Sequence, residues 1–348
     1  MADAGTCHHA PVTMDRRSFI GSGALALAGS VANGAAPDRA AGVLPTLHGA
    51  EFSGMEGIHA PLFTPIGADG RVDEAKVAPT VERLLSSGVV GFYVGGSTGE
   101  GLLLTVAERK RMLKRVAAEN RRRGKLIAHV GAVSTDDSVE LARAAADLGY
   151  DWVSAIQPVF FGQDFESVRR HYERIAGSTD LPFMIYSRGA TVDPDRDAKL
   201  FDIPNVKGMK YTGHDYWEVV RLRRRLGKEA IFFAGSDQQV LSAFAICDLF
   251  SGAIGTTYNA IPMTILSLFR SVEAGCFVEA RRHQADIIAF VEVCKAYGFG
   301  GFKAAMRFVG LDQGPCVGPN RTLSSVEYAT FSAKLAKMDF VPRTGGVR

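Results

Sequence analysis

Several patterns are scarce in this 348-residue chain, and each absence excludes a class of protein. The five cysteines are odd in number, scattered and never in CxxC spacing, which argues against a disulfide framework and against a zinc site. No HxH or HExxH pattern occurs, so the sequence predicts no metal site. The 40 basic and 37 acidic side chains leave a formal net charge of only +3, which provides no electrostatic footprint for nucleic acid.

The composition that is present is typical of a globular protein. Hydrophobic residues make up 47% and charged residues 22%, which is enough for a core and excludes disorder for the bulk of the chain. At ~150 residues per domain, the length predicts two domains or one large α/β barrel.

The first 42 residues differ in composition from the rest. Arg16 and Arg17 precede a weakly apolar Gly/Ala/Ser-rich run from Gly21 to Ala32. This order is typical of a secretory signal and resembles a twin-arginine signal, and the run is shorter than the ~20 residues of a membrane span. We expect residues 1–42 to be a signal peptide and the mature protein to be periplasmic or otherwise exported. The alternatives are an uncleaved anchor, an incidental apolar helix and a cytoplasmic protein.

Past residue 54, short apolar runs alternate with amphipathic helical stretches. The eight runs are Gly57–Phe63, Gly91–Val94, Leu126–Val130, Trp152–Ile156, Pro182–Tyr186, Val206–Tyr211, Ile231–Ala234 and Gly252–Ile254. Runs that are apolar on both faces and lie between helices indicate buried parallel strands. Eight such units predict an α/β fold, a (β/α)8 TIM barrel over residues 43–275. The alternative, a doubly wound open sheet, is disfavoured because no GxGxxG loop follows the first run.

The helical stretches carry their own boundary signals. Predicted helices of the barrel include Asp73–Ser87, Thr105–Asn120 and Ser138–Leu148. Thr105 and Glu108 stand in the order of a capping box. The sequence predicts no further strand in residues 276–348, and the longest helical run, Ala274–Tyr297, leads into this region, so we expect a C-terminal helical appendage.

Residues at the C-terminal ends of the strands carry the chemistry of such a barrel. Lys210 ends the sixth run, and lysine is rarely buried in a strand. If the Lys210 side chain faces the barrel mouth, desolvation lowers its pKa. The amine is then neutral and can attack a ketone to form a Schiff base. The alternative is a lysine on a solvent-facing loop.

Other strand ends are polar as well. Ser97 and Thr98 lie in a glycine-rich loop whose hydroxyls and N–H groups can seat a carboxylate, although an ordinary capped turn is the alternative. Tyr186 can relay a proton or simply pack as an aromatic side chain. Arg121–Arg123 and Arg223–Arg225 are interpreted as helix-end surface charge, and His129 as a core histidine with satisfied hydrogen bonds.

Together these motifs resemble the dihydrodipicolinate synthase / N-acetylneuraminate lyase superfamily of class I aldolases over nearly all of residues 54–310. Tyr93–Glu100, Leu126–Gly131 and Ile254–Asn259 are most similar to the N-acetylneuraminate lyase branch. The resemblance implies a homotetramer that acts on a small-molecule 2-keto acid without a metal or an organic cofactor. We expect no nucleic-acid partner and, after processing, no membrane.

The resemblance also implies roles for individual residues. Lys210 matches the Schiff-base lysine and Tyr186 the proton-relay tyrosine, while Ser97 and Thr98 match the pair that holds the keto acid carboxylate. The positions that match contacts to the sugar-acid chain are Tyr93, Thr212, Gly235, Asp237, Gln238 and Thr256.

The chain departs from the lyase pattern in places. Gln238 stands where the branch usually has an acidic residue, Thr256 where it has serine, and Ser187–Ala190 where it reads Asn-Ile-Pro-Ala. The synthase branch is disfavoured because Thr191 stands in place of its arginine and Val159–Phe161 in place of its tyrosine pair.

We therefore expect a Schiff-base-forming lyase that cleaves a 2-keto-3-deoxy sugar acid, N-acetylneuraminate first among them, to pyruvate and an aldose. A keto-deoxy sugar acid dehydratase or aldolase, and a non-catalytic periplasmic binding protein, are the alternatives. If the fifth strand reaches Arg188, this side chain shares the face of Tyr186 and favours a second anionic or strongly polar group on the substrate.

Overall fold

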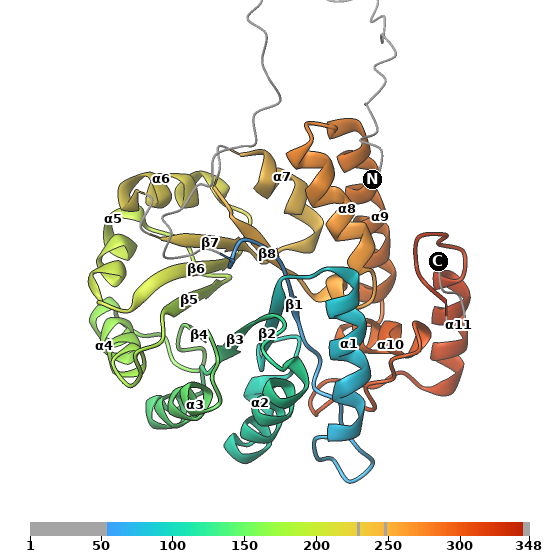
Figure 1. The fold of residues 1–348 in the computed structure, drawn as a ribbon, viewed down its shortest axis with the longest axis horizontal. Helices are drawn as coiled ribbons and strands as arrows, with labels where there is room; N and C mark the ends of the chain where they lie inside the picture. Colours follow the sequence, from blue (N-terminus) through green and yellow to red (C-terminus); the bar gives the residue numbers. More distant parts are fainter. Residues whose placement is uncertain (1–53, 228–229, 247–248, 344–348) are drawn as a thin grey trace, which may run out of the picture. The chain divides into compact units, whose positions relative to one another are not determined.

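The computed structural model describes residues 54–227, 230–246 and 249–343, and the predicted signal peptide lies outside these ranges. Eight parallel strands each pair with the next, and β1 pairs with β8, which closes the barrel (Figure 1). The strands are β1 Gly57–Pro61, β2 Gly91–Val94, β3 Lys125–His129, β4 Trp152–Ile156, β5 Phe183–Arg188, β6 Val206–Thr212, β7 Ile231–Ala234 and β8 Gly252–Ile254. The predicted TIM barrel is confirmed, and an open sheet is excluded.

Strand ends differ from the predicted ones where pairing decides them. The β1 strand stops at Pro61, two residues before the predicted end. The β5 strand runs to Arg188, two residues beyond the predicted end at Tyr186. The extension follows from pairing with β6, because Ser187 and Arg188 continue the register against Tyr211 and Thr212.

Helices cover the outside of the barrel (Figure 1). They are α1 Val77–Ser87, α2 Val106–Asn120, α3 Thr135–Asp147, α4 Phe165–Ala176, α5 Pro194–Asp197, α6 Tyr216–Leu226, α7 Val240–Ala245 and α8 Pro262–Glu273. At the start of α2, the Thr105 hydroxyl accepts the Glu108 N–H at 3.2 Å. The reciprocal half of the predicted capping box is absent, because the Glu108 carboxylate accepts the Val72 N–H at 2.8 Å and pairs with Arg111.

The core has two parts, as the alternation of side chains along strands requires. One cluster fills the barrel interior and consists of Met55, Tyr93, Ile127, Trp152, Met184, Ile231, Phe233 and Ile254. A larger cluster lies between the strands and the helices and includes Phe92, Ile185 and Met209. The two clusters show which of their strand residues face the barrel interior and which face the helices.

The C-terminal part is helical, as predicted. It contains α9 Phe277–Lys295, α10 Phe299–Phe308 and α11 Ser325–Leu335, with α9 lying along α8 (Figure 1). Cys276 is disulfide-bonded, whereas Cys294 and Cys316 are free thiols. The scattered positions of the cysteines thus argued correctly against a framework of several disulfides. They did not exclude one isolated disulfide, and Cys276 takes part in one.

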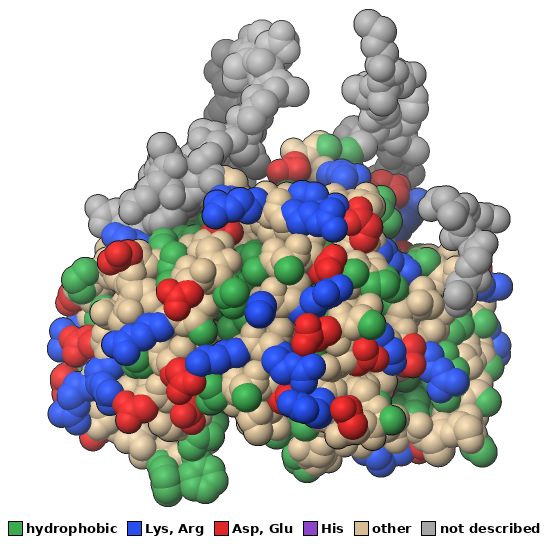
Figure 2. All heavy atoms as spheres, turned by 60° about the horizontal axis from the view of Figure 1, so that its bottom comes forward, with side chains coloured by type: hydrophobic (Ala, Val, Ile, Leu, Met, Phe, Trp, Pro, Cys, Tyr) green, Lys and Arg blue, Asp and Glu red, His purple; other side chains and the backbone are tan. Residues whose placement is uncertain are grey.

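The surface mixes charges of both signs. On the face shown in Figure 2, acidic and basic side chains are interspersed. Within the described ranges, none of the helices combines the length and hydrophobicity that a membrane crossing requires. The same ranges contain no group of three or more His, Cys, Asp or Glu side chains placed to hold a metal ion.

Candidate active site

Lys210 points into the barrel near its C-terminal mouth. Met209 and Tyr211 belong to the outer core, so Lys210 and Thr212 face the interior. The side chain is 5% exposed, and Nζ lies 4.3 Å from the ring centroids of both Tyr93 and Tyr186. Burial lowers the pKa of Lys210 although Tyr186 and Asp237 act in the opposite direction. The alternative of a solvent-facing lysine is wrong, and the amine is tuned towards its neutral, nucleophilic form.

Tyr186 lies directly beside Lys210 in the neighbouring strand, because the two residues are paired in register. Its hydroxyl oxygen is 3.4 Å from that of Ser97. Burial alone would raise the pKa of Tyr186, but the Lys210 ammonium and the Ser97 hydroxyl outweigh it and hold the pKa below its ordinary value. A phenol with a lowered pKa, placed beside the reacting amine, is suited to proton transfer.

The glycine-rich loop after β2 brings Ser97 and Thr98 to the same mouth. Gly95 adopts φ +80°, a left-handed conformation that allows the sharp turn out of the strand. Thr98 Oγ1 lies 2.7 Å from Thr256 Oγ1, which ties this loop to the one after β8. In the described part of the chain, the backbone N–H groups of Ser97 and Thr98 donate to no protein acceptor. Hydroxyls together with free N–H groups form a seat for a carboxylate.

The Tyr93 ring packs against the Lys210 side chain inside the barrel. Its hydroxyl lies 2.9 Å from Ser154 Oγ, and the side chain is fully buried. The structure therefore places Tyr93 inside the barrel, against Lys210.

His129 is a core histidine, as interpreted from the sequence. Its Nε2 accepts the Ile156 N–H at 3.2 Å, so the ring proton is on Nδ1, which faces the Gly95 carbonyl at 3.1 Å. Burial and the charge of Arg109 lower the pKa of His129 well below its ordinary value. The neutral ring therefore links β3 and β4 to Gly95, at the start of the glycine-rich loop that carries Ser97 and Thr98.

Polar atoms without partners lie at the ends of β6 and β7. Asp237 Oδ2 accepts the Thr257 N–H at 3.0 Å, but among the residues that the structure describes neither Asp237 Oδ1 nor Thr212 Oγ1 has a hydrogen-bond partner. Burial raises the pKa of Asp237 to about 6. A side chain at Gly235 would collide with the Thr212 hydroxyl, so glycine keeps this place open. Buried polar atoms left unpaired at a barrel mouth indicate a place for ligand hydroxyls.

Gln238 and Arg188 lie at the edge of this group. Gln238 is half-buried in the turn that begins at Asp237. Arg188 is paired with Thr212 in register, and its place two residues after Tyr186 puts it on the interior face, where it is exposed at the rim. Its charge lowers the pKa of both Lys210 and Tyr186. Within the described ranges its guanidinium has no ion-pair partner, so the cation is available to a ligand.

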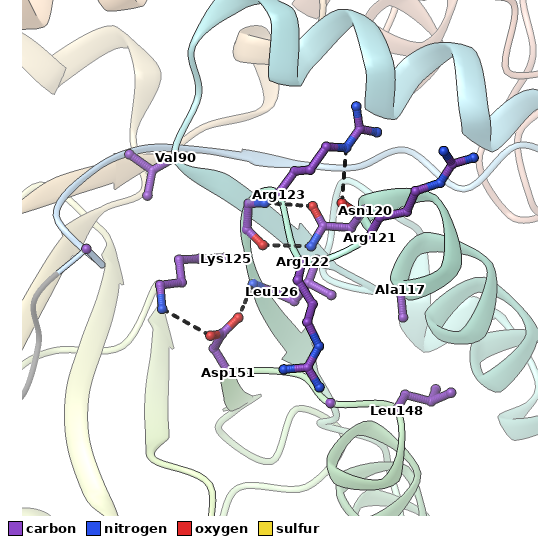
Figure 3. A pocket seen from close by; sticks show the side chains of 13 residues that line it. Val90, Ala117, Asn120, Arg121, Arg122, Arg123, Lys125, Leu126, Leu148 and Asp151 are labelled. Carbon is purple, nitrogen blue, oxygen red and sulfur yellow. Dashed lines mark hydrogen bonds and ion pairs between the residues drawn. The ribbon is translucent and has the colours of Figure 1, made fainter.

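A hollow of about 740 Å³ lies at the other end of the barrel, beside the N-terminal ends of β3 and β4 (Figure 3). Arg123 there pairs with Glu82 at 2.8 Å and donates to carbonyls of the last turn of α2, and Lys125 pairs with Asp151 at 3.2 Å. Arg121–Arg123 are exposed and follow α2 directly, as the interpretation of helix-end surface charge predicted.

No motif in the sequence marks Glu100, the last residue of the glycine-rich segment Gly95–Glu100 after β2, as functional. Its side chain is fully buried and forms an ion pair with Lys303, 203 residues later in the chain. No spacing rule joins two such distant residues. An acidic residue directly after a glycine-rich turn is also an ordinary surface pattern, so only the structure shows this contact.

Comparison with known proteins places the chain in a family. The model of the Dihydrodipicolinate synthetase family matches residues 54–338. The chain is 34% identical over 286 residues to N-acetylneuraminate lyase of Rhizobium meliloti (strain 1021), an alignment that covers 81% of this chain and 95% of that protein.

A second relative and a solved structure agree. N-acetylneuraminate lyase of Clostridium perfringens (strain SM101 / Type A) is 30% identical over 273 residues, which cover 76% of this chain and 93% of that protein. The solved structure of Proteus mirabilis N-acetylneuraminate lyase aligns with a TM-score of 0.78 at 30% identity, over 82% of this chain and 99% of that one. The chain therefore belongs to the dihydrodipicolinate synthetase family, in the branch that contains the N-acetylneuraminate lyases.

Proposed function

We propose that this protein is a class I lyase that cleaves a 2-keto-3-deoxy sugar acid to pyruvate and an aldose through a Schiff base on Lys210. The observation that carries the proposal is a buried lysine with a lowered pKa beside Tyr186 and a carboxylate seat. The Lys210 amine attacks the C2 ketone and water leaves. The resulting iminium accepts the electron pair of the C3–C4 bond as this bond breaks.

Proton transfer completes the cycle. Tyr186 takes the proton of the C4 hydroxyl, with the substrate carboxylate as the relay, so that the aldose can leave as an aldehyde. The enamine that remains on Lys210 receives at C3 the proton that Tyr186 accepted, and water hydrolyses the resulting iminium, which releases pyruvate and the free amine. Ser97 and Thr98 hold the carboxylate throughout, which keeps the breaking bond in line with the iminium.

By similarity alone N-acetylneuraminate is the first candidate substrate, because the relatives named above are N-acetylneuraminate lyases, but two residues of this chain favour a different sugar acid. The unpartnered Asp237 Oδ1 and Thr212 Oγ1 can receive hydroxyls of the sugar-acid chain. Gln238 and Arg188 argue for a substrate that is more acidic than N-acetylneuraminate. A neutral amide accepts a hydrogen bond worth about 1 kcal/mol, against roughly 1.5–3 for a charged acceptor. Arg188 provides a cation at the rim that has no ion-pair partner among the described residues.

The substrate is tested by comparing pyruvate release from N-acetylneuraminate, ketodeoxygluconate and ketodeoxyglucarate. We expect the highest kcat/KM with the doubly acidic ketodeoxyglucarate, and a loss of about tenfold for that substrate in Arg188→Ala, with little change for ketodeoxygluconate. If N-acetylneuraminate is cleaved as efficiently as by typical lyases and Arg188→Ala does not change this rate, the proposed preference for a more acidic substrate is wrong. The proposed lyase activity would still stand. Formation of a dehydrated keto acid without an aldose would instead favour a dehydratase.

We also propose that the protein is a homotetramer. Three apolar side chains protrude from the segment after β4: Val159 is 50%, Phe160 73% and Phe161 67% exposed. Contiguous exposed apolar side chains of this kind are typical of a protein interface. Light scattering should give four times the chain mass, and Phe160→Ser/Phe161→Ser should lower it. A wild-type mass equal to that of one chain would refute the tetramer.

We propose that the protein is exported, because the residues that precede the barrel resemble a signal peptide. Arg16 and Arg17 before a Gly/Ala-rich run support a twin-arginine route. N-terminal sequencing of native protein should find a start between residues 34 and 43, outside the cytoplasm. Lysine at both arginine positions should trap the precursor inside, whereas intact Met1 or Met14 in the cytosol would rule export out.

A further inference from the structure

Glu100 and Lys303 form an ion pair that is closed off from solvent. Lys303 Nζ lies 2.8 Å from Glu100 Oε2, and the two side chains are 2% and 0% exposed. Glu100 lies two residues after Thr98 of the carboxylate seat, whereas Lys303 lies in α10 of the C-terminal helical region. The pair therefore connects the mouth of the barrel to a region that contributes no strand to it.

The remaining hydrogen-bonding capacity of the pair is also directed at the C-terminal region. Glu100 Oε1 accepts the Val317 N–H at 2.7 Å and the Asn320 amide at 3.1 Å, while Lys303 donates to the Pro315 carbonyl at 2.6 Å. Among the residues that the structure describes, every donor to the Glu100 carboxylate thus comes from the C-terminal region. A buried carboxylate with this many charge-assisted and backbone contacts has one arrangement and resists movement.

The backbone of Glu100 shows what this anchoring does to the loop. Glu100 has φ 54°, a left-handed conformation that side-chain-bearing residues rarely adopt, so the surroundings must hold it there. In this conformation its N–H donates to the Ser97 carbonyl at 3.1 Å, and the Gly101 N–H donates to Gly96 at 3.1 Å. These two bonds close the turn that carries Ser97 and Thr98.

We propose that Glu100 and Lys303 are positioning residues through which the C-terminal helical region holds the carboxylate seat in shape. This inference rests on the proposed function, because the carboxylate in question is that of the 2-keto acid. Among the described residues, the side-chain hydrogen bonds and ion pair of Glu100 and Lys303 do not include Lys210. Loss of the Glu100–Lys303 ion pair should weaken binding of the substrate carboxylate equally in the ground state and in the transition state. This raises KM and leaves kcat little changed.

The test variant is Glu100→Gly/Lys303→Met in the full chain. It removes both buried charges together, since removing one alone would leave the other uncompensated, and glycine is relaxed at positive φ. The readout is the concentration of keto compound that gives half-maximal trapping on Lys210 by borohydride, measured with pyruvate and with methyl pyruvate, which lacks the carboxylate charge.

We expect half-maximal trapping to require about tenfold more pyruvate in the variant, with methyl pyruvate unchanged. An equal effect on both compounds, or on neither, would overturn the proposal. Glu279→Gln/Arg282→Met is the matched control, because it removes the same charges from an exposed ion pair on α9 and should change nothing.

A second variant keeps the test decisive if the double variant does not fold. Asn320→Ala removes one donor to Glu100 without leaving a charge unpaired, and we expect about threefold weaker trapping of pyruvate with methyl pyruvate unaffected. An unchanged ratio between the two compounds in Asn320→Ala would refute the positioning role. Absence of any adduct on Lys210 in the wild-type protein would instead refute the proposed function.

Discussion

Lys210→Met should abolish the covalent intermediate and lower lyase activity by about 10³-fold or more. Methionine fills a similar volume against the Tyr93 and Tyr186 rings but offers no amine to a ketone. Incubation with pyruvate, reduction with borohydride and peptide mapping by mass spectrometry provide the measurement. We expect one reduced pyruvate adduct in the wild-type protein, on Lys210, and none in the variant.

Two other lysines are the informative alternatives. Lys207 is half-buried and lies three residues earlier in β6, away from the barrel mouth, and Lys303 is enclosed in its ion pair with Glu100. Lys210→Arg is the matched control, because arginine keeps the positive charge but stays protonated and forms no imine. An adduct on Lys207 or Lys303, or substantial activity in Lys210→Arg, would show that the nucleophile is misassigned.

Tyr186→Phe should separate binding from proton transfer. Loss of the phenol removes the proton acceptor for the C4 hydroxyl, and a positioned acid–base group contributes about 10²–10⁴-fold. We therefore expect kcat to fall by this factor while pyruvate is still trapped on Lys210. A variant that neither cleaves substrate nor traps pyruvate would assign Tyr186 to Schiff-base formation or to folding.

The pH dependence of trapping gives the same experiment a second readout. The free amine is the nucleophile, so trapping should increase with pH through the pKa of Lys210, which burial holds below the ordinary 10.5. Tyr186 acts against burial and raises this pKa. In Tyr186→Phe the pKa of Lys210 should fall further, and the rise in trapping should move to lower pH. A shift to higher pH would contradict the electrostatic arrangement.

The sequence alone was sufficient for the architecture and for placing Lys210 and Tyr186 at the ends of neighbouring strands. Eight apolar runs between amphipathic stretches predicted the closed barrel, because side-chain period and burial on both faces are local properties that survive in the fold. A lysine and a tyrosine at the ends of neighbouring runs were also visible, and parallel strands bring such ends to one edge. Pairing in register of Tyr186 with Lys210 follows from this arrangement.

Contacts between distant segments were decided only by the tertiary structure. The β5 strand continues to Arg188 because β6 lies beside it. Glu108 does not complete the predicted capping box because its carboxylate accepts the Val72 N–H instead. Glu100 and Lys303 are 203 residues apart, and nothing in the identity of either residue predicts the other. A local pattern depends on neighbours in the chain, whereas the partner of a buried charge depends on the path of the whole chain.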